Sequence, residues 1–258
     1  MPVQRWLDVL VQDFRYGARQ LLRKPGFALA AAFSLALGIG ANTAIFTLVD
    51  QVLVRLLPVE KPQELVRLRV DGGRIGSQSG DGTHTFPYPT YLALRDQNTV
   101  FSGLTGQRVE QSSMVEGDNR ELVSVAMVAG NYFQVLGLKA HIGRLLTPDD
   151  DRLLDGHPLA VLQYDYWQTR FAGRSEVLGQ TVRLNGKPFT VIGVAAQGYE
   201  GTDTGFPNKL WVPIAMKPTI TPTNPKLDEE RSSWFYVFGR LKPGVSREQA
   251  AASMRVLY

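Results

Sequence analysis

Twenty-three consecutive residues near the N-terminus, 27–49, carry no charged side chain and are mostly apolar. As an α-helix they would extend about 34 Å, and the hydrocarbon core of a bilayer is about 30 Å thick. The polar side chains in this run are those of Ser34, Asn42, Thr43 and Thr47. Serine and threonine hydroxyls can bond back to helix carbonyls, so only Asn42 is costly in lipid. The run therefore predicts a transmembrane helix, continued by further apolar residues as a short stalk, so that residues 27–57 form one element.

Charge is distributed unevenly on the two sides of this element. Residues 1–26 hold five cations and two anions, whereas residues 59–258 hold 22 cations and 21 anions. An excess of arginine and lysine marks the cytoplasmic flank of a membrane helix. The sequence therefore predicts an inner (plasma) membrane protein with a cytoplasmic N-terminus and a large periplasmic domain at residues 58–258. The near-neutral balance of that domain argues against a nucleic-acid-binding surface.

Two other interpretations of the apolar run are available. A cleavable signal peptide would use Gly38-Ile39-Gly40 as a small-residue cleavage site. The long cationic leader and the apolar residues that continue past Gly40 favour a retained anchor instead. The remaining alternative is a buried helix of a soluble protein.

Residues 1–26 have an amphipathic pattern. Apolar residues recur at helical spacing, and Arg15, Arg19 and Arg23 lie on another face. The apolar positions are Trp6, Leu7, Leu10, Phe14, Gly17/Ala18 and Leu21. The pattern predicts a cytoplasmic amphipathic helix on the inner membrane surface, ended by a break at Pro25-Gly26. The alternative is a helix that packs on cytoplasmic protein.

One face of the predicted membrane helix carries small residues at intervals of four: Ala28, Ala32, Ala36, Gly40 and Ala44. Such ridges let helix backbones approach closely in lipid, where apolar surface alone gives no drive to associate. We interpret this ridge as a helix-packing surface of a bundle. An alanine-rich anchor also produces this spacing by chance, and the sequence leaves both interpretations open.

Beyond residue 58 the pattern predicts an α+β domain, because strands and short helices intermix. Asn185-Gly186 between two apolar runs is the strongest hairpin signal, and Ser246 with Gln249 forms a capping-box pattern that opens a C-terminal helix. Loops are expected at 71–81 and 213–233. The expected strands are 64–70, 111–115, 121–128, 159–163, 181–184, 189–194, 210–214 and 234–241. The expected helices are 91–98, 131–136 (with Asn131 as its cap), 164–171 and the one that begins at Ser246.

Motifs for chemistry are missing from the sequence. There is no P-loop, no Gly-x-Ser-x-Gly elbow and no cysteine. The glycine-rich run 72–76 has no helix after it, as a phosphate loop requires. His84, His141 and His157 are not at the spacing of a zinc site. Asp149–Asp151 follow Thr147-Pro148 and are better explained as the acidic first turn of a helix than as a calcium loop. The sequence thus predicts no catalytic, cofactor or metal site, and it predicts that the chain is not an enzyme.

Several motifs in order resemble MacB-like (FtsX-like) ABC transporter permeases, and most of all the acidobacterial duplicated orphan permease branch. Each motif alone is weak, but their ordered combination covers nearly the whole chain. The motifs are residues 13–27 (DFRYGARQLLRKPGF), 37–46 (LGIGANTAIF), 86–91 (FPYPTY), 130–133 (GNYF), Leu136-Gly137, Gly143-Arg144, 184–186 (LNG), 191–194 (VIGV) and 211–213 (WVP).

The resemblance implies one N-terminal transmembrane helix and a periplasmic core domain with porter-like and lid-like subdomains. It also implies a cytoplasmic ABC ATPase subunit that binds ATP, further transmembrane helices after the core domain, and, by analogy, a homodimer. Movement driven by the ATPase would pass through the helices to the periplasm (mechanotransmission) for export or efflux. The family is associated with export of macrolides, peptides or lipoproteins.

The sequence ends at Tyr258 inside a predicted helix. We therefore expect a fragment of a longer permease whose core domain is truncated at the C-terminus. The alternative function is a single-pass, membrane-anchored periplasmic binding or sensor module without transport activity. An anchored extracytoplasmic enzyme is a third interpretation, which the missing catalytic motifs disfavour.

Overall fold

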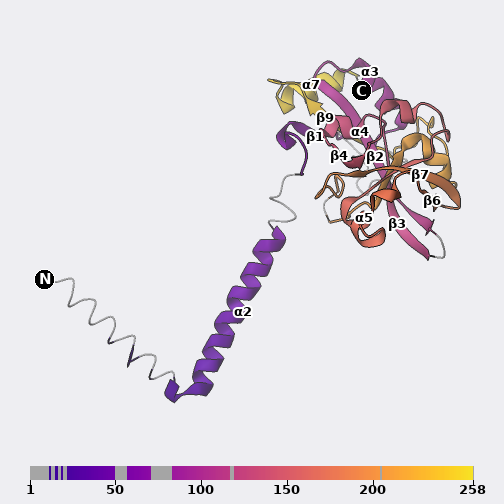
Figure 1. Ribbon diagram of the computed structural model, residues 1–258. Helices are drawn as coiled ribbons and strands as arrows, with labels where there is room; N and C mark the ends of the chain where they lie inside the picture. Colours follow the sequence, from indigo (N-terminus) through magenta and orange to yellow (C-terminus); the bar gives the residue numbers. More distant parts are fainter. Residues whose placement is uncertain are drawn as a thin grey trace. The chain divides into compact units, whose positions relative to one another are not determined.

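The structure is a computed structural model that describes residues 22–49, 57–70, 83–116, 119–203 and 205–257, with positions 12, 15, 16 and 19. The chain divides into two compact units, residues 1–55 and 56–258. Figure 1 shows the first unit as the long helix α2 and the second as a folded α+β domain. The two units are described separately below.

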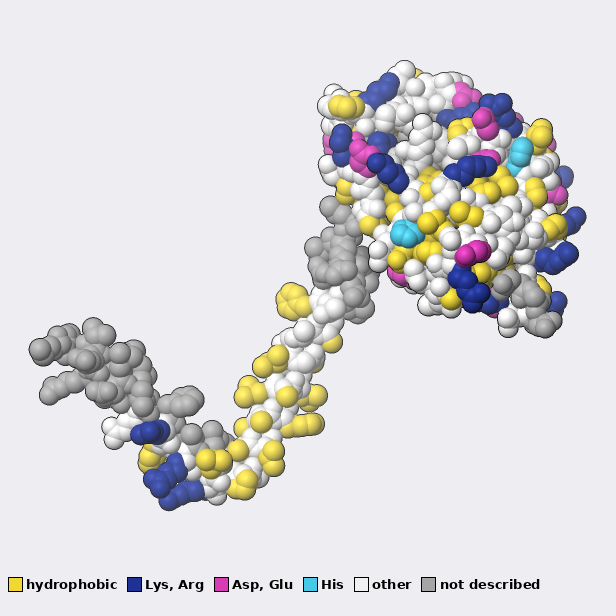
Figure 2. Space-filling view, viewed as in Figure 1, with side chains coloured by type: hydrophobic (Ala, Val, Ile, Leu, Met, Phe, Trp, Pro, Cys, Tyr) yellow, Lys and Arg dark blue, Asp and Glu magenta, His cyan; other side chains and the backbone are white. Residues whose placement is uncertain are grey.

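Helix α2 spans Pro25–Val49. It begins at the break expected for Pro25-Gly26, because proline is compatible with the first turn of a helix. Its first backbone hydrogen bond runs from the Ala28 amide to the Lys24 carbonyl, at 3.1 Å. Residues Ala28–Thr47 are long and apolar enough to cross a membrane, and none of them is buried. Hydrophobic side chains project from α2 along its length (Figure 2). A helix with apolar side chains all round is typical of a membrane span.

The described strands of the domain form one mixed sheet in the order β1-β9-β2-β3-β8-β5-β7-β4, with β6 paired to β2 and β7. The pairs β3–β8 and β5–β7 are parallel and the other pairs are antiparallel. The strands are β1 (Leu65–Arg67), β2 (Phe101–Glu116), β3 (Asn119–Val128), β4 (Ala140–Gly143), β5 (Leu159–Leu162), β6 (Thr181–Leu184), β7 (Lys187–Ala195), β8 (Leu210–Pro213) and β9 (Tyr236–Leu241).

The central strands of this sheet are buried on both faces. In β3, Val125 and Met127 join one apolar cluster and Ala126 and Val128 join another. Strand β8 alternates in the same way, with Trp211 on the second side. Successive side chains of a strand point to opposite faces, so a strand covered on both faces needs an almost continuous apolar sequence. This requirement explains the runs LAVL in β5 and LWVP in β8.

Helices cover both clusters. The larger cluster takes side chains from α3, α5, α6 and α7, and the smaller cluster takes them from α4. The helices are α3 (Tyr88–Gln97), α4 (Tyr132–Leu136), α5 (Tyr164–Arg170), α6 (Lys217–Ile220) and α7 (Arg247–Leu257). Short 3-10 turns are η2 (Pro62–Glu64), η3 (Pro148–Asp151), η4 (Ser175–Val177) and η5 (Ile214–Met216).

The α+β prediction is confirmed, and so are its two sharpest local signals. Asn185 and Gly186 have φ of 49° and 82°, the left-handed pair that a tight hairpin between β6 and β7 requires. At the start of α7 the Gln249 amide donates to the Ser246 hydroxyl at 3.2 Å. The Ser246 amide donates back to the Gln249 side chain at 2.9 Å, which completes the capping box.

The expected loop at 213–233 is wrong in its first part. Residues 214–220 form η5 and α6, and Ile214, Met216 and Ile220 are buried in the core. The chain also contains β4, which the sequence analysis missed. Asn131 is the N-cap residue of α4, as expected, but its side chain makes no capping hydrogen bond; its amide donates instead to the Leu104 carbonyl at 2.9 Å.

Strand β2 begins ten residues before the expected start at residue 111. Gly103 and Gly106 interrupt the apolar pattern there. A Cβ at Gly106 would collide with the Tyr236 carbonyl and the Phe235 ring, and one at Gly103 would collide with Val135. Glycine inside a strand marks such close approaches, and a single sequence does not reveal them.

Three predicted features lie outside the described residues. They are the apolar face of the amphipathic helix at residues 1–26, the stalk at residues 50–56 and the glycine-rich loop at residues 71–81.

Candidate functional site

The predicted packing ridge lies on α2. Ala28, Ala32, Ala36, Gly40 and Ala44 all fall within this helix, one turn apart, as an i±4 ridge requires. A Cβ placed on Gly40 would meet nothing within 4 Å. The ridge is therefore open among the residues that the structure describes, and its role in helix packing stays a prediction.

The hydroxyl groups of α2 are satisfied within the helix. Ser34 donates to the Ala30 carbonyl at 2.9 Å, and Thr43 and Thr47 donate to carbonyls four residues earlier at 2.8 Å. This bonding removes the cost of these side chains in lipid. Asn42 makes no comparable bond to a described residue, so its amide is the polar group on α2 that still needs a partner.

Arg240 holds the first described residues of the domain in place. Its side chain, 14% exposed, extends from β9 toward the junction segment, residues 57–64. Its guanidinium donates to the carbonyls of Glu60 at 2.6 Å and Lys61 at 3.2 Å, and to the Glu64 carboxylate at 3.4 Å. Its Nε donates to the Val135 carbonyl at the end of α4, at 2.7 Å. One side chain therefore ties the junction segment, α4 and β9 together.

The junction segment makes further contacts with the same region. The Glu60 amide donates to the Leu136 carbonyl at 3.2 Å. Gly137 has φ of 69°, and a Cβ there would lie 2.5 Å from the Cβ of Glu60. Strand β1 then pairs with β9 from Leu65 to Arg67. The chain is thus firmly fixed to β9 within a few residues of its first described position in the domain.

A buried polar network lies beside the smaller core cluster. The Tyr132 hydroxyl donates to the Gln107 side chain at 2.8 Å and lies 2.7 Å from the Tyr199 hydroxyl. The Gln107 amide donates to Asp203 at 3.1 Å. Burial raises the pKa of each of these two tyrosine hydroxyls well above the usual value for tyrosine. Both hydroxyls therefore stay protonated at neutral pH. The network is suited to holding β2 and α4 to the segment after β7 that carries Tyr199 and Asp203, not to acid–base chemistry.

The acidic cluster Asp149–Asp151 forms the first turn of η3, as the sequence analysis expects. Asp150 receives two hydrogen bonds from Arg144, at 2.6 and 2.9 Å, and two from Thr147. Burial acts to raise the pKa of Asp150, but these hydrogen bonds outweigh it and hold the pKa below its usual range. This carboxylate is therefore charged and fully engaged by protein donors.

Asp151 behaves in the opposite way. It accepts hydrogen bonds from the amides of Gly130 and Ala215, each at 2.9 Å. Burial dominates and raises its pKa to about 6. The two neighbouring carboxylates thus bind different segments, and the described residues hold no group of three acidic, histidine or cysteine side chains suited to a metal ion. The three histidines likewise do not come together in such a group.

Lys217 is a buried amine that sequence reasoning missed. The side chain is 3% exposed, and its ammonium group donates to the carbonyls of Asn224 and Lys226 and lies 4.5 Å from the Trp234 ring centre. Burial lowers its pKa. Its donors are already taken by the loop after α6, so Lys217 anchors that loop and is not placed as a nucleophile.

Neither Arg240 nor Lys217 stands in a motif of the sequence. The available signal is a long cation inside an apolar stretch, YVFGRL for Arg240 and IAMKPTI for Lys217. Such a residue is rarely buried without a partner. The partners are backbone carbonyl groups, of distant segments for Arg240 and of the loop after α6 for Lys217, and a sequence pattern does not indicate them.

A family model described as the MacB-like periplasmic core domain matches residues 28–257. A curated relative is the macrolide export ATP-binding/permease protein MacB of Aggregatibacter actinomycetemcomitans, 26% identical over 206 residues. The match covers 78% of this chain but only 30% of that protein's length.

Solved structures share the fold of the domain. The periplasmic region of MacB from Actinobacillus actinomycetemcomitans has a TM-score of 0.57 and 20% identity, and covers 77% of this chain and 86% of its own. The extracellular domain of the noncanonic ABC-type transporter YknZ from Gram-positive bacteria has a TM-score of 0.53 and 17% identity, and covers 74% of this chain and 92% of its own. At this level of identity the likeness shows the fold alone.

Proposed function

This chain belongs to the family of MacB-like periplasmic core domains, and we propose that it is a permease component of an ABC transporter. In this proposal a separate cytoplasmic ATPase subunit hydrolyses ATP, and the chain passes the resulting movement to its periplasmic domain to drive export. The family match, the apolar helix α2 and the similarity to a macrolide export ATP-binding/permease protein support this proposal. The chain spans about 30% of that relative's length, so we further propose that it is part of a longer permease with more transmembrane helices.

The proposed topology places the N-terminus in the cytoplasm and the large domain in the periplasm, at the inner membrane. The cation excess before α2 supports this orientation. Protease added to the outside of spheroplasts should then digest residues 58–258 while the N-terminal leader survives. Survival of the large domain would contradict the proposed orientation.

The observation that carries the coupling proposal is the junction held by Arg240. A movement that arrives at residue 57 passes into the domain efficiently if the first residues of the domain are fixed to its sheet. The junction segment is fixed by three hydrogen bonds from the Arg240 guanidinium and by the pairing of β1 with β9. A push or pull on this segment therefore reaches β9, and β9 leads directly into the turn before α7.

The coupling is tested in proteoliposomes that contain the complete transporter. The chain has no cysteine, so Leu122→Cys introduces a single site for a fluorophore. Energy transfer from this fluorophore to acceptor lipids in the outer leaflet reports the distance of the domain from the membrane. Arg240→Gln, or a flexible glycine insertion after Pro58, should abolish the ATP-dependent change in energy transfer. The matched control is Arg183→Gln, because Arg183 is exposed and makes only a local bond to Gly186.

Thermal unfolding separates loss of coupling from loss of fold, since Arg240→Gln should leave a folded domain with a modestly lower midpoint. If the ATP-dependent change persists in both junction variants, the domain does not receive its movement through this segment. If no ATP-dependent change occurs in the unmodified transporter, the permease proposal itself is contradicted.

A further inference from the structure

An open groove of about 830 Å³ lies on the face of the sheet that carries the smaller core cluster. Its volume falls in the range of small-molecule sites, about 300–1,000 Å³. Strands β1, β9, β2 and β3 form its floor, and the segment between β7 and β8 forms its wall. The lining residues that matter for its chemistry are Arg67, Gln111, Ser124, Asp203, Phe206 and Tyr236.

Strand register brings the floor of the groove together. Tyr236 of β9 lies opposite Gln107 of β2. Gln111, four residues further along β2, lies opposite Ser124 of β3. Residues that lie opposite one another, and every second residue of a strand, share a face of the sheet. The side chains of three strands therefore point into one groove.

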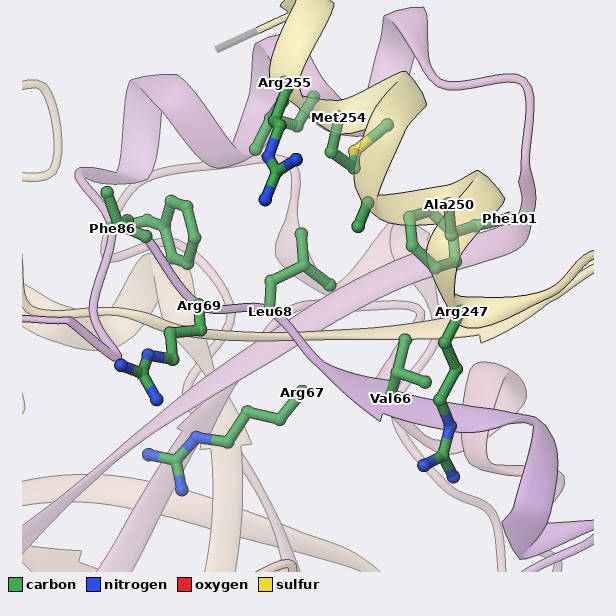
Figure 3. A pocket seen from close by; sticks show the side chains of 13 residues that line it. Val66, Arg67, Leu68, Arg69, Phe86, Phe101, Arg247, Ala250, Met254 and Arg255 are labelled. Atoms are coloured by element: carbon green, nitrogen blue, oxygen red, sulfur yellow. The ribbon is translucent and has the colours of Figure 1, made fainter. Parts of the chain in front are cut away.

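The Arg67 side chain is held by stacking, while its hydrogen-bond donors stay open. Figure 3 shows that it leaves β1 on the side opposite the apolar pocket that residues 66–70 form with α7. Its guanidinium carbon lies 4.2 Å from the centre of the Tyr236 ring. Its nearest carboxylate oxygen, on Asp203, is 3.8 Å away, which is too long for a hydrogen bond. The Arg67 guanidinium thus donates no hydrogen bond to a described residue.

The Asp203 carboxylate is held by the buried polar network. One of its oxygens accepts a hydrogen bond from the side chain of Gln107 at 3.1 Å, and Gln107 is itself fully buried and bonded to the Tyr132 hydroxyl. The other oxygen is the one that faces Arg67, and it accepts no hydrogen bond within the described part of the chain. The groove therefore presents open donors beside an open acceptor, on side chains that are already fixed.

An aromatic ring lines the same groove. The side chain of Phe206 is 74% exposed, although its segment is fixed. The Phe206 amide donates to the Asp203 carbonyl at 3.3 Å, and the Asn208 amide donates to the Glu200 carbonyl at 2.8 Å. A single exposed ring is common on protein surfaces. The informative feature is that this ring shares its groove with the open polar atoms of Arg67 and Asp203.

The charges of the groove favour an uncharged ligand. Both arginines that line it have a carboxylate partner, Asp203 for Arg67 and Glu110 for Arg108, the latter at 2.8 Å. The strands of the floor already use their backbone groups in the sheet, so an extended peptide would find no strand edge to pair with. The ligand must therefore be bound by side chains.

Sugars meet these requirements. A hydroxyl group both donates and accepts hydrogen bonds, so two neighbouring hydroxyls match an open donor beside an open acceptor. The C–H face of a pyranose ring is apolar, and contact with an aromatic ring removes both surfaces from water.

We propose that this groove binds a saccharide. A pyranose ring lies against Phe206, and two of its neighbouring hydroxyls bind between the Arg67 guanidinium and the free oxygen of Asp203. The Gln111 side chain and the Tyr236 hydroxyl bond to no described residue and serve a second sugar ring. The proposal goes beyond the transport function and does not depend on it.

The test applies the full chain, in nanodiscs with a tagged scaffold, to an array of neutral oligosaccharides and neutral peptides. The oligosaccharides are built from glucose, galactose, mannose and N-acetylglucosamine, and calorimetry then measures the affinity for the glycan with the strongest signal. We expect binding to at least one of these glycans. Phe206→Ala should weaken it about tenfold through loss of the aromatic contact. Arg67→Gln should also weaken it about tenfold, through loss of a charge-assisted hydrogen bond.

Matched variants separate the groove from the rest of the surface. Leu154→Ala removes a side chain that is 63% exposed and lies outside the groove, and Arg231→Gln removes an exposed arginine outside it. Neither change should alter the affinity, and Phe206→Trp, which keeps an aromatic ring, should retain binding. Thermal unfolding checks that each variant is folded. Because Phe206 is exposed, Phe206→Ala keeps the test valid even if Arg67→Gln fails to fold.

Three results would overturn the proposal. The first is that no glycan binds above the level of empty nanodiscs; binding of the peptides alone would indicate a peptide ligand. The second is equal affinity of the Phe206→Ala chain and the unmodified chain for the glycan. The third is equal affinity for the glycan and for its fully methylated form, which would mean that the sugar hydroxyls are not recognised.

Discussion

Helix α2 and the domain treat their apolar side chains in opposite ways. On α2 the side chains of Leu29, Phe33 and Leu37 are 71%, 72% and 64% exposed. In the domain, Leu104 and Trp211 are fully buried. An exposed apolar helix is stable only where lipid or other helices replace water, whereas the domain encloses its own interior. The difference shows that apolar residues are suited to lipid on α2 and to a protein interior in the domain. It also shows that α2 depends on surroundings outside the described residues.

The largest predicted effect is a loss of stability caused by a substitution in the interior of the domain. Trp211 stacks on Tyr199 with ring centres 5.5 Å apart and meets Phe133 edge-on at 5.7 Å. Trp211→Ala should lower the free energy of unfolding by about 3–5 kcal/mol, because it leaves a cavity between β8 and the smaller cluster. Chemical denaturation of the full chain in micelles measures this. Leu122→Ala, at a position 70% exposed, is the control and should change it by less than about 0.5 kcal/mol.

The sequence predicts the parts of the fold that local patterns determine. Alternating or continuous apolar runs identify β3, β5, β8 and β9, and Asn185-Gly186 identifies the β6–β7 hairpin because few residues adopt φ above zero. The missed parts depend on distant contacts. The first half of β2 contains Gly103 and Gly106, which only the groups packed on them explain: the Val135 side chain on Gly103, and the Phe235 ring and Tyr236 carbonyl on Gly106. Residues 214–220 look like a proline-rich loop, but their apolar side chains are helical and buried.

The candidate sites likewise divide into those that a local sequence pattern reveals and those that depend on contacts formed only in the folded chain. The small-residue ridge follows from a spacing of four, so a sequence is enough to find it. Arg240 acts through carbonyl groups that lie more than 100 residues away in the sequence. The apolar pocket lined by residues 66–70 and α7 likewise depends on segments about 180 residues apart. Pairings of this kind are set by the fold as a whole.

Introducing an arginine at an exposed leucine of each region tests whether α2 lies in lipid while the surface of the domain lies in water. Leu37, at the middle of the apolar span, and Leu122, on the domain, are similarly exposed at 64% and 70%. Leu37→Arg should weaken membrane insertion by about 2.5–3.5 kcal/mol, whereas Leu122→Arg should change domain stability by less than about 0.5 kcal/mol. Alkaline extraction of membranes measures the inserted fraction. Equal and small effects of both changes would mean that α2 lies in water.

The pH dependence of stability is a property of the domain and not of α2, which has no charged side chain between residues 27 and 49. Burial raises the pKa of Asp151 from 3.8 to about 6. The folded state therefore holds the Asp151 proton more tightly than the unfolded state does. The contribution of this group to the free energy of unfolding is complete below pH 4 and is lost as the pH rises through 6. The loss should be about 2 kcal/mol, less than the full shift implies because the side chain is not wholly buried.

This loss is measured as the unfolding free energy of the unmodified chain minus that of Asp151→Asn, which cannot titrate. The difference should fall between pH 4 and pH 7. Asp150 contributes with the opposite sign and in another window, because its pKa is lowered and its stabilisation is lost only as the pH drops below its usual range. A difference that stays constant or rises from pH 4 to pH 7 would contradict the assignment to Asp151.

The smallest predicted effect asks whether α2 has a partner in the membrane. Gly40 belongs to the small-residue ridge, whereas Gly38 lies about 200° around the helix from it. A Cβ at either position meets nothing within 4 Å, so neither substitution strains the described structure. If the ridge packs on another helix, Gly40→Leu should weaken association by on the order of 1 kcal/mol and Gly38→Leu should not. Energy transfer between labelled copies in bilayers, with and without the rest of the transporter, measures both. Equal effects of the two leucines would mean that the spacing of four arose by chance and that α2 serves as an anchor alone.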